Sequence, residues 1–105
     1  MAPAGRVLLA SVDSTNAEGF RRAATAPGDL PLWIVAREQT AGRGRRARPW
    51  ASPPGNFYGS LAMRVDGPPA QVALRSFAAA LALRDAFVAL TGLPQVFALK
   101  WPNDV

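Results

Sequence analysis

Four arginines and two glycines fall within seven residues of this chain, from Gly42 to Arg48. Guanidinium groups packed so closely repel one another unless an anion lies among them. The glycines let backbone N–H groups approach such an anion. The chain contains no Cys and no His, which excludes thiol nucleophiles, disulfides, Cys/His metal sites and histidine acid–base catalysis. These residues predict a loop that binds a phosphate-bearing ligand.

Polar side chains also gather at the ends of two predicted strands. One run is Asp13-Ser14-Thr15-Asn16, and the other is Lys100-Trp101-Pro102-Asn103-Asp104. Taken alone, the first run indicates a helix start, because Thr15 and Glu18 have capping-box spacing, and the second indicates a polar turn. Ligand sites of α/β proteins often gather at strand ends, so both runs are candidate binding segments.

A dinucleotide-binding interpretation of the arginine segment fails. Gly42, Gly44 and Ala47 fit the G-x-G-x-x-A spacing after a predicted strand. However, three prolines follow within the next seven residues and exclude the helix whose N-terminus would hold the pyrophosphate. Two alternatives stay open at this point: a solvated basic loop without a ligand, and a nucleic-acid contact through clustered arginines.

The bulk composition indicates one small domain. The chain has 105 residues, 50% of them hydrophobic, which is not a disordered composition. The formal net charge is +5, and the window from Arg37 to Arg48 holds five arginines and one glutamate (5 − 1 = +4). The excess charge is therefore local, as at a binding site. No secretory signal and no run of about 18 apolar residues is visible, which predicts a cytoplasmic location.

The elements that must position these segments follow from hydrophobic periodicity. The pattern predicts strands at residues 6–12, 32–38, 57–65 and 96–101, and helices at residues 16–24 and 71–91. We expect Gly92 to end the second helix. The order β-α-β-β-α-β favours an α/β fold of the α+β type, with helices packed on a mixed sheet.

Two features do not fit a finished domain. Arg84 lies within the apolar stripe of the second helix, so it either snorkels to the edge or faces a surface that the chain does not supply. The sequence stops at Val105, just after a polar turn that would normally lead into a partner strand. We therefore expect a truncated domain.

The three segments occur together and in order, and in that arrangement the chain resembles the catalytic domain of biotin–protein ligases. The resemblance covers nearly the whole chain and rests on residues 13–16, 38–46, 48, 50, 56–61 and 99–105. It implies the biotin–lipoate ligase catalytic fold, which is similar to class II aminoacyl-tRNA synthetases. Residues 1–105 would be its N-terminal portion, with the C-terminal part absent and no DNA-binding domain before it.

The resemblance implies a two-step enzyme that uses ATP, biotin and Mg²⁺. Biotin and ATP would form biotinyl-5′-AMP, and a lysine of a biotin carboxyl-carrier domain would then take the biotinyl group. The carrier domain of a carboxylase is thus the expected partner, DNA and membranes are not, and a homodimer stays open.

The resemblance also assigns roles by position. The residues expected to bind biotin are Ser14, Thr15, Asn16, Gln39, Gly42, Arg43, Gly44 and Arg45. Those expected to bind the adenylate are Arg46, Arg48, Trp50, Lys100 and Asn103. Arg45 and Lys100 are the expected catalytic residues, and Asp104 is a candidate metal ligand.

The chain departs from the family pattern at Ala47, where many members have glycine. A lysine that follows the Lys-Trp-Pro-Asn-Asp turn in the family is absent from these 105 residues. Two functional alternatives remain: a lipoate or octanoyl transferase of the same superfamily, against which the arginine loop argues, and a non-enzymatic basic module that binds nucleic acid.

Overall fold

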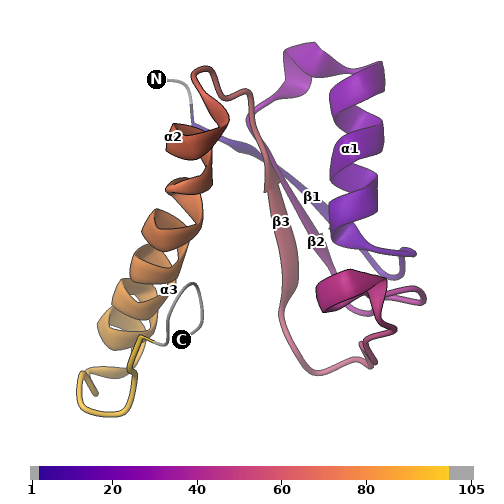
Figure 1. The fold of residues 1–105 in the computed structure, drawn as a ribbon. Coiled ribbons are helices and arrows are strands. Elements are labelled where there is room, and N and C mark those ends of the chain that lie inside the picture. The colour runs from indigo at the N-terminus through magenta and orange to yellow at the C-terminus, as the bar shows by residue number, and fades with distance from the viewer. Residues whose placement is uncertain (1–2, 100–105) are drawn as a thin grey trace. The chain divides into compact units, whose positions relative to one another are not determined.

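The structure is a computed structural model that describes residues 3–99. The expectations for Lys100, Trp101, Asn103 and Asp104 fall outside the described residues. Contacts divide the chain into two compact units, Met1–Arg64 and Val65–Val105. The sheet belongs to the first unit and the longest helix to the second (Figure 1).

The first unit is built on a mixed three-stranded sheet. Its strands are β1 (Gly5–Leu9), β2 (Leu32–Ala36) and β3 (Tyr58–Ala62), in the order β1-β2-β3. β1 pairs with β2 in parallel, with Val7 opposite Ile34, and β3 pairs with β2 antiparallel, with Ser60 opposite Ile34. A parallel pair needs a crossover connection, and α1 (Thr15–Thr25) supplies it. The predicted mixed sheet with helices is confirmed.

One face of this sheet packs against α1 (Figure 1). Leu32, Ile34 and Ala36 alternate into that face and are buried, with Ile34 0% exposed. Burying an Ile side chain stabilises a fold by about 1.5–3 kcal/mol. Gly19 of α1 sits over the same spot, and a Cβ there would lie 3.7 Å from Ile34 Cδ1 and 3.7 Å from Ala62 Cβ. The core beneath the candidate site is therefore formed by β2, β3 and the middle of α1.

The strands are shorter than the apolar pattern predicted, but their pairing continues beyond them. Val12 forms a parallel bridge with Gln39, and Gln39 forms an antiparallel bridge with Ser52. Gln39 thus lies between Val12 and Ser52, just as β2 lies between β1 and β3. The Asp13–Asn16 turn and the start of the arginine loop therefore lie at the same end of the sheet.

In the second unit, the single helix predicted at residues 71–91 is two helices, α2 (Pro69–Ala73) and α3 (Arg75–Thr91). The interruption falls at Leu74, whose N–H donates to the carbonyl of Gln71 three residues back at 3.2 Å. α3 ends at Gly92 as predicted, in the left-handed conformation with φ +69°. No helix within residues 3–99 is long and apolar enough to cross a membrane.

The strand predicted at residues 96–101 is wrong for its described part. Val96 closes a turn by donating to the carbonyl of Leu93 at 3.1 Å, and residues 97–99 have no regular structure. The guanidinium of Arg84 donates hydrogen bonds to the carbonyls of Pro94 and Phe97. In a strand, these carbonyls would accept from the backbone of a neighbouring strand instead. Arg84 is half-buried, and its guanidinium is hydrogen-bonded to its own chain.

Candidate functional site

The first part of the site is the N-terminus of α1. Ser14 is the N-cap: its Oγ accepts from the Ala17 N–H at 3.2 Å. The predicted capping box was one residue out of register, because Thr15 is already the first helical residue. Glu18 instead pairs with Arg21 and Arg22. Helix N-termini present unsatisfied N–H groups, and within residues 3–99 neither the backbone N–H nor the side-chain amide of Asn16 has a hydrogen-bond partner.

Gln39 joins this helix start to the chain near the arginines. Its Oε1 accepts from the Thr15 N–H at 2.8 Å, and its Nε2 donates to Ser52 Oγ at 3.1 Å. The Thr15 hydroxyl forms a further hydrogen bond of 2.8 Å with Ser60 Oγ. We call Ser14, Thr15, Gln39, Ser52 and Ser60 the polar cluster. Thr15 and Ser52 are only 4% and 6% exposed, and buried polar groups that are all hydrogen-bonded hold one arrangement.

Backbone hydrogen bonds hold the two segments together independently of these side chains. The Thr40 N–H donates to the carbonyl of Val12 at 2.9 Å, and the Ala41 N–H donates to the carbonyl of Asp13 at 2.8 Å. The candidate turn at residues 13–16 therefore touches the residues that lead directly into the arginine loop. Segments about 25 residues apart in sequence form one surface.

The arginine loop (residues 42–48) is a small hairpin. Its two arms are joined by the Trp50 N–H, which donates to the Gly42 carbonyl at 2.8 Å, and by the Gly44 N–H, which donates to the Arg48 carbonyl at 2.7 Å. Gly42 is required by space: a Cβ there would lie 2.5 Å from Ser52 Oγ and 2.7 Å from the Trp50 carbonyl oxygen. A Cβ on Gly44 would lie 3.3 Å from the Trp50 ring. Close backbone approach at both glycines thus ties the loop to the polar cluster.

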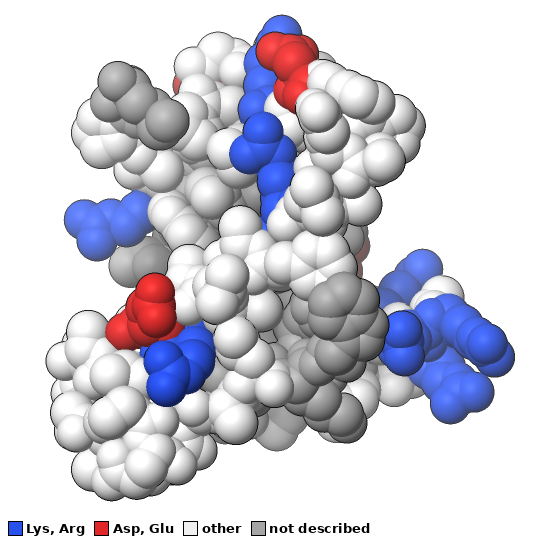
Figure 2. All heavy atoms as spheres, turned by 60° about the vertical axis from the view of Figure 1, so that its left-hand side comes forward, with Lys and Arg blue, Asp and Glu red and all other residues white. Residues whose placement is uncertain are grey.

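The tip of this hairpin is a single 3₁₀ turn, Arg45–Ala47, in which Arg46 and Ala47 both have φ +57°. Consecutive N–H groups in such a turn form a concave anion-binding surface. Arg45, Arg46 and Arg48 line an open hollow there. Within the described part of the chain, no carboxylate forms an ion pair with any arginine of the loop. Figure 2 shows basic side chains gathered at one edge of the view.

An ion-pair network braces the turn before α1. Arg21 contacts both carboxylate oxygens of Asp13, at 2.6 and 2.9 Å, and Asp13 also accepts from the Ser14 N–H. These bonds, chiefly that with Arg21, lower the pKa of Asp13 from 3.8 to about 2. The pKa of Glu18 is lowered by Arg22 and Arg21. Asp13 is therefore ionised at neutral pH and serves as a fixed anchor for the turn.

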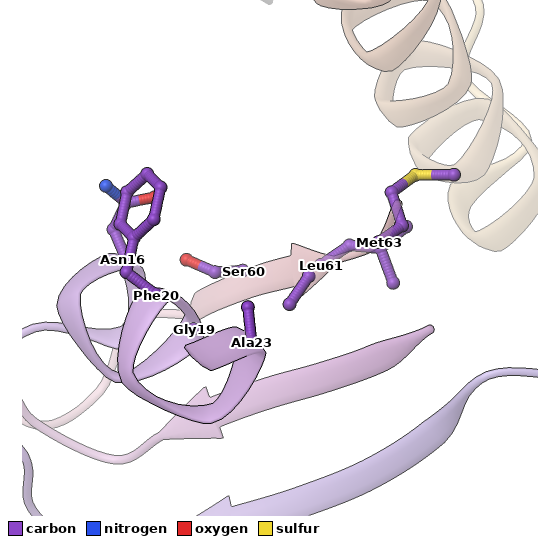
Figure 3. Close-up of a pocket in the computed structure, with 8 residues that line it drawn as sticks. Asn16, Gly19, Phe20, Ala23, Ser60, Leu61 and Met63 are labelled. Atoms are coloured by element: carbon purple, nitrogen blue, oxygen red, sulfur yellow. The ribbon is translucent and has the colours of Figure 1, made fainter. Parts of the chain in front are cut away.

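An open cavity of about 170 Å³ lies between α1 and β3, next to the polar cluster. Its lining is mostly apolar and includes Phe20, Leu61 and Met63. Figure 3 shows Asn16 and Phe20 rising side by side from α1, with Ser60 of β3 facing them. Small-molecule sites commonly combine an apolar wall with a few placed polar groups, and this cavity has that composition.

The profile of the Biotin/lipoate A/B protein ligase family matches residues 8–105. The chain belongs to this family. It is 50% identical over 98 residues to the biotin–[acetyl-CoA-carboxylase] ligase of Paracoccus denitrificans, a match that covers 93% of this chain and 40% of that protein.

Solved structures of the family have the same fold. The Leishmania major biotin protein ligase in complex with biotinyl-5-AMP superposes with a TM-score of 0.73 and 29% identity, over 96% of this chain and 46% of that one. The Aquifex aeolicus biotin protein ligase in complex with biotin and ATP gives a TM-score of 0.69 and 31% identity, over 95% and 40% of the two chains. The chain thus spans less than half the length of each of these relatives.

In this member of the biotin/lipoate ligase family, most of the predicted site residues in the described range lie together. Thr15, Gln39 and Gly42 are hydrogen-bonded to, or packed against, one another or Ser52. Ser14 caps α1 next to Thr15. Asn16 lines the adjoining cavity. The arginines of the loop and Trp50 are exposed beside them. The roles of these residues stay predictions.

Two members of the polar cluster, Ser52 and Ser60, are not among the predicted site residues. Ser52 lies in a segment predicted only as a turn, and its burial results from the bridge to Gln39, which no local pattern shows. Ser60 could have been found, since it is a hydroxyl on the same strand face as Tyr58 and Ala62, the face that packs against α1. Within residues 3–99 no group of three or more His, Cys, Asp or Glu side chains lies close enough to hold a metal ion.

Proposed function

We propose that this chain is part of the catalytic domain of an ATP-dependent biotin–protein ligase. In the first step a carboxylate oxygen of biotin attacks the α-phosphorus of ATP, which gives biotinyl-5′-AMP and releases pyrophosphate. In the second step the amine of a carrier-domain lysine attacks the acyl carbon and loses a proton, and AMP leaves. The expected protein partner is a carboxylase carrier domain, and Mg²⁺ would arrive with ATP, whose phosphates are its usual ligands in such enzymes.

The observation that carries this proposal is the junction of the polar cluster with the arginine loop through Gln39 and Gly42. Biotin has a polar ureido ring fused to an apolar thioether ring, and a carboxylate at the end of an alkyl chain. The polar cluster offers hydrogen-bonding groups for the first, and the adjoining apolar cavity offers contact for the rest. A ligand held there would extend its carboxylate toward a neighbouring source of positive charge.

The arginine loop is that source. The first step concentrates negative charge at the α-phosphate, and preorganised cations and N–H groups stabilise such charge. Arg45, Arg46 and Arg48 surround a hollow next to the N–H groups of the loop tip. We propose that Arg45 acts on the acyl phosphate and that Arg46, Arg48 and Trp50 hold the adenylate. The mixed anhydride is reactive, so a loop that folds over it would also exclude water.

The family to which the chain belongs also includes lipoate ligases, so a lipoate or octanoyl transferase is the second candidate. Its substrates lack a ureido group, so their ring offers no donor or acceptor to the Asn16 amide that lines the cavity. This difference, together with the match to the Paracoccus denitrificans biotin ligase, favours biotin.

Titration calorimetry of the purified chain with biotinyl-AMP, with biotin and with lipoate tests the proposal. We expect biotinyl-AMP to bind more tightly than biotin, and lipoate not to compete. Arg45→Gln should weaken biotinyl-AMP binding at least tenfold, whereas the control Arg6→Gln, at an exposed position of β1, should change it less than twofold. A folded chain that binds neither biotin nor its adenylate refutes the proposal, and salt-sensitive binding of a random oligonucleotide would favour the nucleic-acid module instead.

A further inference from the structure

Ser52 lies where the arginine loop meets the polar cluster, and its hydroxyl contacts both. Its Oγ accepts a hydrogen bond from Gln39 Nε2 at 3.1 Å and donates one to the Trp50 carbonyl at 3.2 Å. The Ser52 carbonyl also accepts from the Gln39 N–H at 3.1 Å. Ser52 is only 6% exposed and its one hydroxyl proton is already used, so the hydroxyl serves its neighbours rather than a ligand.

The two arms of the hairpin change register beside Ser52. Bridges join Gln39 to Ser52 and Arg43 to Pro49. Between these bridges the first arm has three residues and the second arm has two. An extra residue on one strand of an antiparallel pair is a β-bulge, which bends the strand and interrupts the ladder of backbone hydrogen bonds. The backbone groups next to the bulge therefore need other partners.

The Trp50 carbonyl is such a group, and its donor is a side chain. The Trp50 N–H donates to the Gly42 carbonyl at 2.8 Å. Within residues 3–99, no backbone N–H donates to the Trp50 carbonyl in return. The Ser52 hydroxyl does so instead. A hydroxyl has one proton and a carbonyl can only accept, so the Ser52 oxygen is left as an acceptor toward Gln39.

We infer that Ser52 is a positioning residue that links the arginine loop to Gln39. Because the Trp50 carbonyl holds its proton, Ser52 can pair only with the NH₂ group of Gln39. The amide oxygen then faces the Thr15 N–H, with which it forms a bond of 2.8 Å. The closed hairpin and the orientation of the Gln39 amide thus support each other through one hydroxyl. The inference rests on the proposed function, in which the polar cluster binds the ureido ring of biotin.

A side chain that only filled space at this position would not make this link. Alanine would leave the Trp50 carbonyl without its donor and the Gln39 amide with one side-chain bond in place of two. One bond lets the amide swing about it, whereas two bonds fix its plane. A group that donates on one side and accepts on the other is therefore what this position requires, and a serine hydroxyl does both.

The first test measures hydrogen exchange of backbone amides by NMR, without any ligand. We expect Ser52→Ala to speed exchange of the Trp50 N–H about fivefold. The internal reference is the Arg37 N–H, which donates to the Leu9 carbonyl at 3.0 Å and should change less than twofold. Gln39→Glu should speed the Trp50 exchange as much as Ser52→Ala, because a carboxylate can only accept and draws the Ser52 proton away from the carbonyl. The matched control Gln39→Met offers no such acceptor and should change it less than twofold.

A double variant separates this link from a general loss of stability. Once Ser52→Ala is present, Gln39→Glu should add less than a twofold effect, because the hydroxyl through which it acts is gone. Equal acceleration at Trp50 and Arg37 would show general destabilisation. Equal effects of glutamate and methionine would show that the hydroxyl proton does not link the two segments. Either result overturns the inference.

The second test measures binding of biotin by calorimetry. Ser52→Ala should raise the Kd for biotin about fivefold, but less than twofold in a Gln39→Ala background, because the side chain through which it acts is absent. The control Ser76→Ala makes the same chemical change at an exposed position of α3 and should match the parent. Equal effects in both backgrounds would overturn the inference. A parent chain that does not bind biotin refutes the proposed function, while the exchange test still decides whether Ser52 links Gln39 to the arginine loop.

Discussion

Replacing Gly42 by alanine adds one methyl group at the tightest point of the candidate site. The new Cβ would lie 2.5 Å from Ser52 Oγ, 2.7 Å from the Trp50 carbonyl oxygen and 3.2 Å from Gln39 Nε2. The Trp50 carbonyl is backbone and sits across the hairpin from Gly42, so it cannot move aside without opening the hairpin. The conformation of Gly42 is not the obstacle, because its φ is not positive.

The magnitude follows from two terms. Overpacking of this kind destabilises by about 1–3 kcal/mol. Opening the hairpin also weakens the Trp50–Gly42 hydrogen bond of 2.8 Å, which is worth about 1 kcal/mol. We therefore expect Gly42→Ala to lower the free energy of unfolding by about 2–4 kcal/mol. The bond between Gln39 and Ser52 is displaced in the same movement, so biotin binding should weaken by more than tenfold.

The assay is urea unfolding followed by fluorescence, combined with titration calorimetry against biotin. Gly28→Ala is the matched control, because a Cβ there meets nothing within 4 Å and should change stability by about 0.5 kcal/mol or less. If Gly42→Ala unfolds at the same urea concentration as Gly28→Ala and binds biotin as the parent does, the loop is not packed against the polar cluster and this reasoning fails.

Three further predictions concern the neighbouring residues. Ala47→Gly should raise the free energy of unfolding by about 1 kcal/mol, because Ala47 has φ +57° and the left-handed conformation is unfavourable by about 1–2 kcal/mol for a residue with a Cβ; urea unfolding with no gain would contradict this. The carboxyl of Asp13 should titrate at about 2 rather than 3.8, so its contribution to stability is complete above about pH 4 and is lost as the pH falls toward 2. A titration by carbon NMR checks this, and Arg21→Gln should return the pKa toward its ordinary value; a pKa near 3.8 in the parent would refute the ion pair. Thr15→Val should destabilise by about 1–3 kcal/mol in urea, since it leaves the Ser60 hydroxyl without its partner, whereas Thr15→Ser should lose less than half as much; equal losses would show that the hydroxyl is not what matters.

The main helices and strands could be predicted from the sequence, because each depends on a hydrophobic pattern within its own few residues. The alternation of buried residues in β2 and the breaker residues after α1 are visible in any window of about ten residues. The start of α1 was misplaced by one residue for a reason that is not local. Ser14 and Thr15 can both cap a helix, and the Ser14 cap is supported by Gln39, which accepts from the Thr15 N–H from 24 residues away.

The segment after α3 shows the opposite failure, in which local preference was misleading. Val96 and Phe97 favour strands, but a strand also needs a partner for its carbonyls. The carbonyl of Phe97 is instead satisfied by a side chain 13 residues earlier. Arg84 was visible in the sequence as an anomaly, yet nothing in a linear pattern shows which acceptor a long side chain will reach.

The amide of Gln39 is locked against rotation by its two bonds. Turning it by 180° would put its oxygen toward Ser52 and its NH₂ group toward the Thr15 N–H, where two donors would meet. Its orientation is therefore fixed, and the Thr15 and Ser52 bonds leave one N–H and one oxygen lone pair free. A ring that carries a carbonyl beside an N–H can bond to both this donor and this acceptor, whereas a dithiolane ring can bond to neither. The direction of one side-chain amide would then set the selectivity between the two rings. Replacing Gln39 by glutamate, which has almost the same shape, would remove the donor and keep the acceptor.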